Sequence, residues 1–234
     1  MNSIAEAAGQ AFALVADADP KLVDIVLLSL RVSLTAVAIG CVIGLPLGAA
    51  VAVNEFRGRR ALIVILNALM GLPSVVVGLV VYLLLSRAGP LGSWGILFTP
   101  TAMVIAQSIL IAPTLAALSR QVVGDAWQEY REQLRSLGET KLGAAPTLLW
   151  DLRFSLVTIV LAGFGRAASE VGAVMIVGGN IDGVTRVMTT TIALETSKGD
   201  LPLALGLGLI LLFIVLALNA GAYLVKEMAQ RWYG

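Results

Sequence analysis

The chain contains no histidine, one cysteine and few charged residues, and each of these shortages excludes a class of function. Asp, Glu, Lys and Arg together make up 13% of the 234 residues, against about 25% in an average soluble domain. The absence of histidine removes the commonest metal ligand and general base, which argues against metal-dependent hydrolysis and serine-histidine catalysis. Cys41 is alone, which excludes an intrachain disulfide and disfavours a thiolate metal site. We therefore expect no metal site.

Sequence motifs for catalysis and nucleotide binding are also missing. The chain has no G-x-x-x-x-G-K-[ST] phosphate-binding loop, no H-E-x-x-H and no G-x-S-x-G. Its formal net charge of +1 provides no basic field for nucleic acid. Apolar residues, in contrast, make up 58% of the chain, and the mean hydropathy is +0.91. We therefore expect a membrane protein that is not itself an enzyme.

Five apolar runs are each long enough to cross a bilayer as a helix, which takes about 20 residues. The second run is interrupted by Gly71-Leu72-Pro73, a combination that breaks helices. We predict an all-α membrane protein with about five transmembrane helices and with its two termini on opposite sides. The predicted spans cover residues 29–53, 61–86, 100–118, 155–177 and 201–225.

The distribution of Lys and Arg predicts the orientation. Residues 54–60, residues 120–153 and the tail from residue 226 hold ten of these residues, and the opposite side holds five. The positive-inside rule then places the N-terminus outside and the C-terminus in the cytoplasm. The predicted organisation is an extracytoplasmic or interfacial segment 1–28, a transmembrane domain 29–225 with a cytoplasmic loop at about 120–154, and a cytoplasmic tail 226–234. The sequence leaves open whether residues 21–30 join the first span.

The cytoplasmic loop is polar and has the pattern of two short helices. Asp125 is placed to cap the first helix, with Gln128 three residues further on. Gly138 stands where a left-handed C-cap would end that helix, and a second helix is expected at about 140–150. The alternative is a solvated loop with a few helical side-chain pairs.

The spacing in this loop resembles the EAA loop of ABC importer permeases, which runs Glu-Ala-Ala, three residues, Gly, nine residues and Ile-x-Leu-Pro. Glu132 and Gly138 stand at the separation of the motif, and Leu148 falls at its Ile position. Gln133 and Leu134 replace the two alanines, and a Trp-Asp pair replaces Leu-Pro. The likeness therefore rests on spacing more than on identity.

The spans carry a resemblance to the same family. SLTAVAIGCVIGLPLGAAVAV, with the basic turn that follows it, and ALMGLPSVVVGLVVYLLLSRAGPLG resemble the first two core spans of molybdate- and sulfate-type permeases. LAGFGRAASEVGAVMIVGGNI and TRVMTTTIALETSKGD look most like the tungstate-specific branch of that group. The resemblance covers about residues 29–225.

This resemblance implies the architecture of a type I ABC importer permease in a prokaryotic inner membrane. It implies three partners: a cytoplasmic ATPase that uses ATP and Mg, an extracytoplasmic substrate-binding protein, and a second permease copy in a homodimer. This chain itself would bind no cofactor. The residues implied in coupling to the ATPase are Glu132, Arg135, Gly138 and Leu148.

Two pairs are candidates for the gate or the pathway. Arg166 and Glu170 lie four residues apart in the fourth predicted span, where one helix face would bring them together. A structural ion pair is the alternative for them. Pro73 and Ser74 lie at the interruption of the second span, and a broken span can line a cavity.

Two further patterns have both a packing and a pathway interpretation. Gly40, Gly44 and Gly48 recur every four residues, a spacing typical of close helix packing. The run Thr189-Thr190-Thr191 offers hydroxyls to an anion or, as we favour, caps a helix.

Several functions remain open from the sequence. Within the importer family, tungstate is favoured, and molybdate, sulfate or another small anion is the alternative, because molybdate and tungstate have nearly the same size and charge. An ion-coupled secondary transporter also has broken helices and intramembrane charges, but it leaves the EAA-like loop unexplained. A membrane scaffold is the remaining alternative.

Overall fold

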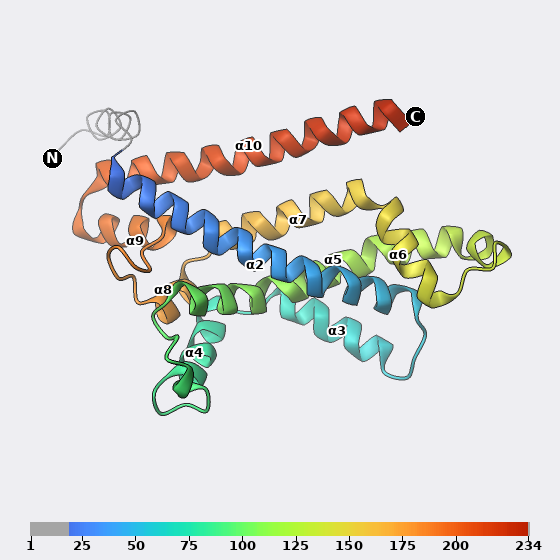
Figure 1. Cartoon of the computed structure of the whole chain (residues 1–234), viewed down its shortest axis with the longest axis horizontal. Helices are drawn as coiled ribbons and strands as arrows, with labels where there is room; N and C mark the ends of the chain where they lie inside the picture. The colour runs from blue at the N-terminus through green and yellow to red at the C-terminus, as the bar shows by residue number, and fades with distance from the viewer. Residues whose placement is uncertain (1–18, 234) are drawn as a thin grey trace. The chain divides into compact units, whose positions relative to one another are not determined.

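The structure of the protein, a computed structural model, describes residues 19–233 (Figure 1). The predicted segment 1–28 therefore lies mostly outside the described residues. Within residues 19–233 every regular element is helical, as predicted. The elements are α2 (Pro20–Val53), α3 (Arg59–Met70), α4 (Ser74–Leu85), the 3-10 helix η1 (Gly92–Trp94), α5 (Pro100–Ser136), α6 (Lys141–Asp151), α7 (Arg153–Ala168), α8 (Gly172–Gly178), α9 (Met188–Lys198) and α10 (Leu201–Tyr233).

The helices allow the predicted number of spans but do not require it. Three of them, α2, α5 and α10, are long and apolar enough to cross a membrane. The count rises to five if two broken pairs, α3 with α4 and residues Gly143–Asp151 with α7, each form one span. The break between α3 and α4 falls at residues 71–73, as predicted. Because α2 already begins at Pro20, residues 21–30 belong to the first helix.

Two predicted helix boundaries are wrong. Asp125 does not cap a helix, because α5 runs without interruption from Pro100 to Ser136 and Asp125 lies inside it. Buried Val123 and Ala126 flank this position, so apolar packing continues past the predicted membrane boundary. Residues 155–177 do not form one helix, because α7 ends at Ala168 and α8 starts only at Gly172.

A sharp bend separates α6 from α7. The helical segments Gly143–Asp151 and Arg153–Ala168 are bent by 79°. Arg153 lies at this bend: its Nη1 donates to the Trp150 carbonyl at 2.9 Å, and its guanidinium lies over the rings of Trp150 and Phe154. The cation-π contacts and the hydrogen bond to a carbonyl at the end of α6 both stabilise the Arg153 side chain in this position.

The described residues form two compact units, each assembled from three separate stretches of chain. The first unit contains residues 19–35, 74–107 and 168–221. It has a buried cluster formed by Leu22, Met188 and Leu207. A Cβ added to Gly78 of α4 would come within 2.8 Å of the Ala173 Cα in α8, so these two short helices are in close contact.

The second unit contains residues 36–73, 108–167 and 222–233. Its centre is the contact between α2 and α5, where Gly40, Gly44 and Gly48 face the backbone and side chains of α5 between Ile111 and Arg120. The packing interpretation of these glycines is confirmed, because an added Cβ at each would lie 2.9 Å or less from α5 atoms. The Ser119 hydroxyl also donates to the Leu45 carbonyl at 3.1 Å, which joins the same two helices.

Candidate coupling segment and pathway residues

The segment predicted to be cytoplasmic contains a helix end, a glycine turn and a second helix, as expected from the sequence. At the end of α5, the Gly138 N–H donates to the Arg135 carbonyl and the Glu139 N–H donates to the Leu134 carbonyl, both at 3.0 Å. These two bonds define a Schellman motif, and Gly138 has the left-handed φ of +82° that the motif requires. Thr140 then caps α6 by accepting the Gly143 N–H at 3.1 Å. The turn is thus determined by local hydrogen bonds.

The four predicted coupling residues have two different environments. Glu132, Arg135 and Gly138 are exposed around the turn. Leu148 is only 1% exposed, because it packs in a cluster with residues of α2 and α5 such as Ala49 and Val123. Leu148 therefore anchors α6 and is not itself a contact surface for a partner.

The apolar residues of this segment show a helical repeat in the sequence, but the sequence assigned them no role. Trp127, Tyr130, Leu134 and Leu137 repeat at helical spacing in the sequence, but only Trp127 and Leu134 pack against the buried cluster. Leu137 is 74% exposed and lies next to Gly138. A large apolar side chain on a polar segment favours contact with a protein partner.

The structure does not place Arg166 and Glu170 on one helix. Arg166 lies in the last turn of α7, where a positive charge interacts favourably with the C-terminal dipole. Glu170 lies beyond the end of that helix, so the predicted pairing on a single helix face is wrong. Its carboxylate instead accepts the Ala173 N–H at 3.0 Å, and its carbonyl accepts the Thr189 hydroxyl at 2.8 Å. Glu170 therefore stabilises the start of α8.

Pro73 and Ser74 lie where α4 begins. Proline has no N–H and disfavours a helical conformation in the residue before it, which explains why α3 ends before Pro73. The Ser74 hydroxyl oxygen lies 3.0 Å from the position that a Cβ on Gly172 would take. The first residues of α4 and α8 are therefore adjacent within the first unit, and both follow a break in the chain.

The threonine run caps α9, which confirms the interpretation that we favoured. Thr189, Thr190 and Thr191 are 8%, 0% and 1% exposed. The Thr190 hydroxyl oxygen accepts the Val187 N–H at 3.1 Å, and the Thr190 and Thr191 hydroxyls donate to the Val187 carbonyl at 3.1 and 2.7 Å. Ser29 of α2 accepts the Met188 N–H at 2.7 Å. The three hydroxyls thus hold the backbone in place and do not form an open anion path.

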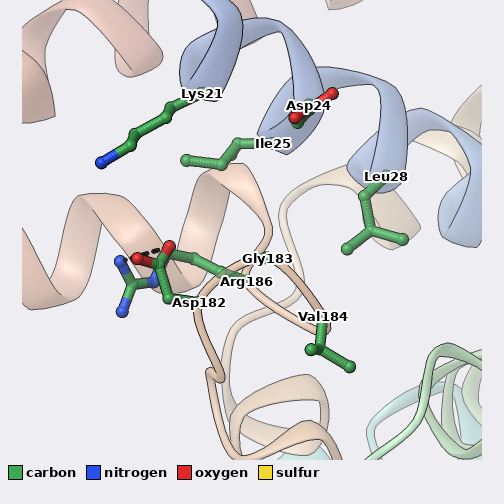
Figure 2. Close-up of a pocket in the computed structure, with 8 residues that line it drawn as sticks. All are labelled: Lys21, Asp24, Ile25, Leu28, Asp182, Gly183, Val184 and Arg186. Carbon is green, nitrogen blue, oxygen red and sulfur yellow. Dashed lines mark hydrogen bonds and ion pairs between the residues drawn. The ribbon is translucent and has the colours of Figure 1, made fainter.

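A polar pocket of about 500 Å³ lies in the first unit between the start of α2 and the loop that joins α8 to α9 (Figure 2). Figure 2 shows Lys21 on α2, across the pocket from the paired Asp182 and Arg186 side chains. That ion pair measures 3.0 Å. One indication of this site was present in the sequence, because the orientation rule places residues 21 and 182–186 on the same predicted outer side.

Family comparison agrees with this architecture. Residues 44–233 match the family described as binding-protein-dependent transport system inner membrane component. The chain belongs to this family, and it is therefore an inner-membrane permease subunit of an ABC transporter. Membership implies an ATPase subunit and a substrate-binding protein as partners.

Individual relatives cover most of the chain. It is 44% identical to a tungstate uptake system permease protein, TupB, of Peptoclostridium acidaminophilum, over 97% of this chain and 100% of the relative. A probable anion ABC transporter permease protein of Haloferax volcanii is 44% identical over 85% of this chain and 88% of its own length. TupB of Campylobacter jejuni is 37% identical over 74% of this chain and 72% of the relative. Permeases named for sulfate transport match at lower identity.

Proposed function

We propose that this permease carries tungstate inward as a homodimer, with energy from a cytoplasmic ATPase that uses ATP and Mg. The observation that carries the substrate assignment is the 44% identity over 97% of the chain to a tungstate uptake permease. The orientation predicted from Lys and Arg places the polar pocket at Lys21 outside and the Gly138 turn in the cytoplasm. The substrate-binding protein would then deliver the anion to the side that carries Lys21.

The coupling segment supports transmission of movement from the ATPase. Because α5 is one helix from Pro100 to Ser136, a force applied near Glu132 acts on the membrane-embedded part of the same helix. Leu148 attaches α6 to α2 and α5 through one buried cluster, so these three elements move together within the second unit. Exposed Glu132, Arg135 and Leu137 would contact the ATPase.

Glu170 acts in this proposal as a positioning residue near the pathway. Glu170→Gln should retain most uptake, because an amide oxygen can still accept the Ala173 N–H. Glu170→Ala removes the acceptor, and loss of such a cap costs about 0.5–2 kcal/mol. We therefore expect Glu170→Ala to lower both the thermal midpoint and uptake more than Glu170→Gln does. Loss of uptake in a well-expressed Glu170→Gln variant would instead assign a role to the negative charge.

Substrate choice is tested by uptake into cells that express the permease with its ATPase and its binding protein. We expect ATP-dependent tungstate accumulation that resists an excess of sulfate. If sulfate or molybdate competed with tungstate as well as tungstate itself does, the protein would be a general oxyanion importer. If tungstate accumulated without the ATPase and in response to an ion gradient, the importer proposal would be wrong and the protein would be a secondary transporter.

A further inference from the structure

A second polar pocket lies in the other unit, where α2 ends and α5 continues toward the coupling turn. Its volume is about 160 Å³, which is enough for a small ion together with a few waters at about 30 Å³ each. Its lining residues come from the end of α2, from the turn and the start of α3 that follow it, and from α5. Those that matter here are Arg59, Arg120, Arg131, Glu55 and Asp125.

The charges that line this pocket favour an anion. Three guanidinium groups face two carboxylates, which leaves an excess of one positive charge. Arg120 and Arg131 are eleven residues apart on α5, so three helical turns place them on the same face. Gly124 lies between them on that face, and a Cβ there would meet only Ala52, at 4.0 Å. The helix surface at Gly124 therefore has no close contact with another element.

Arg59 is fixed at the edge of this pocket by the end of α2. Its Nε donates to the Val51 carbonyl at 2.8 Å, and its Nη2 donates to the Ala52 carbonyl at 3.0 Å. These bonds use two of the five N–H donors of the guanidinium and compensate the negative end of the helix dipole. Arg59 is therefore held in place before any ligand arrives.

Arg120 provides the observation that points to a ligand. Its Nε is fully buried and has no hydrogen-bond acceptor among the described residues. A buried, charged donor without an acceptor is destabilising, and an ion or water that supplies the acceptor is the usual explanation. An oxygen that faces the pocket would satisfy this group.

We propose that this pocket binds a tetrahedral oxyanion group through Arg120, Arg131 and Arg59. Arginine is suited to this ligand because its planar fork matches two oxygens of phosphate or carboxylate geometry. The group comes either from a free cytoplasmic oxyanion or from the phosphate of an anionic lipid, since the pocket lies on the predicted cytoplasmic side near the membrane boundary. The site is separate from the substrate proposal, and its test does not measure transport.

The first arm of the test uses the full-length chain in nanodiscs of phosphatidylcholine, a lipid without net charge. Phosphate, sulfate or tungstate is titrated against chloride at constant ionic strength, and the thermal midpoint is followed. Binding to the folded state raises the midpoint in a saturable way. We expect Arg131→Gln to raise the half-saturating concentration about tenfold, as expected for loss of a charge-assisted hydrogen bond.

Arg57→Gln is the matched control, because Arg57 is an exposed arginine of the same turn that does not line the pocket. Its half-saturating concentration should equal that of the wild type. Arg131 is exposed, so its variant is expected to fold. Arg120→Lys is a second variant that keeps the charge and removes the buried Nε donor, and we expect it to weaken binding as well.

The second arm identifies the source of the group. The same variants are placed in nanodiscs that contain phosphatidylglycerol, without added oxyanion. A higher midpoint that Arg131→Gln loses and Arg57→Gln keeps would assign the site to a lipid head group, and the same result with free anions in phosphatidylcholine would assign it to a soluble oxyanion. If Arg131→Gln and Arg57→Gln respond alike in both arms, the proposal is wrong.

Discussion

Gly138→Val is expected to reduce uptake at least about tenfold while the protein still inserts into the membrane. Gly138 has a φ of +82°, and an L-residue in this conformation costs roughly 1–2 kcal/mol, with β-branched residues the least tolerated. The strain can be relieved only by opening the two hydrogen bonds that end α5. Opening that turn would displace α6 and the exposed residues on both sides of it.

Two variants separate this effect from general damage. Gly138→Asn should keep most uptake, since asparagine enters the left-handed region more readily than valine. Gly58→Val places the same residue at a φ of +91°, with nothing within 4 Å of the new Cβ, in the turn between α2 and α3. We expect this control to lose less uptake. The coupling role would be contradicted if Gly138→Val, expressed at normal levels, copurified with the ATPase and transported normally.

Gly48→Val is expected to have the largest effect on folding. An added Cβ would overlap the Ala116 carbonyl oxygen and would lie 2.8 Å from the Arg120 backbone nitrogen. Both are backbone atoms of α5, so the two helices would have to separate. Overpacking costs about 1–3 kcal/mol and occasionally more, and here it acts on the contact at the centre of the second unit.

The measurement is the yield of monodisperse protein in detergent and its thermal midpoint. Gly48→Ala should already lower both, and Gly48→Val should lower them further. Gly165→Ala is the control, because Gly165 lies in α7 with nothing within 4 Å of an added Cβ, and alanine there should be neutral or stabilising by about 0.5–1 kcal/mol. A Gly48→Ala protein as stable as the wild type would mean that α2 and α5 do not approach as closely as described.

Local features of the structure were predictable from the sequence. The turn at Gly138 that follows α5 and the break before Pro73 depend on backbone preferences of single residues. The helix start predicted at Asp125 was wrong because a capping pattern depends only on local sequence. Val123 and Ala126 pack in the buried cluster that contains Leu148, and this packing continues α5 through Asp125. Leu148 was assigned from its place in a motif, and a motif position does not reveal burial.

The candidate pathway was less predictable for a related reason. Helical spacing assumes that the helix continues between two residues, and Glu170 lies where α7 has already ended. The carbonyl of Glu170 is bound by Thr189, nineteen residues further along the chain. A contact between two separate elements cannot be predicted from the periodicity of the sequence.

The sequence by itself determined the membrane environment and the glycine turn at Gly138, and it predicted five spans and an orientation. These depend on composition, on charge along the chain and on local backbone conformation. None of these properties depends on contacts with residues that are distant in the sequence. Only the tertiary structure decided that Leu148 is an anchor, that Ser29 caps α9 and that three arginines from two helical regions line one pocket. Those outcomes depend on which helix faces pack together, and packing is determined by the whole chain.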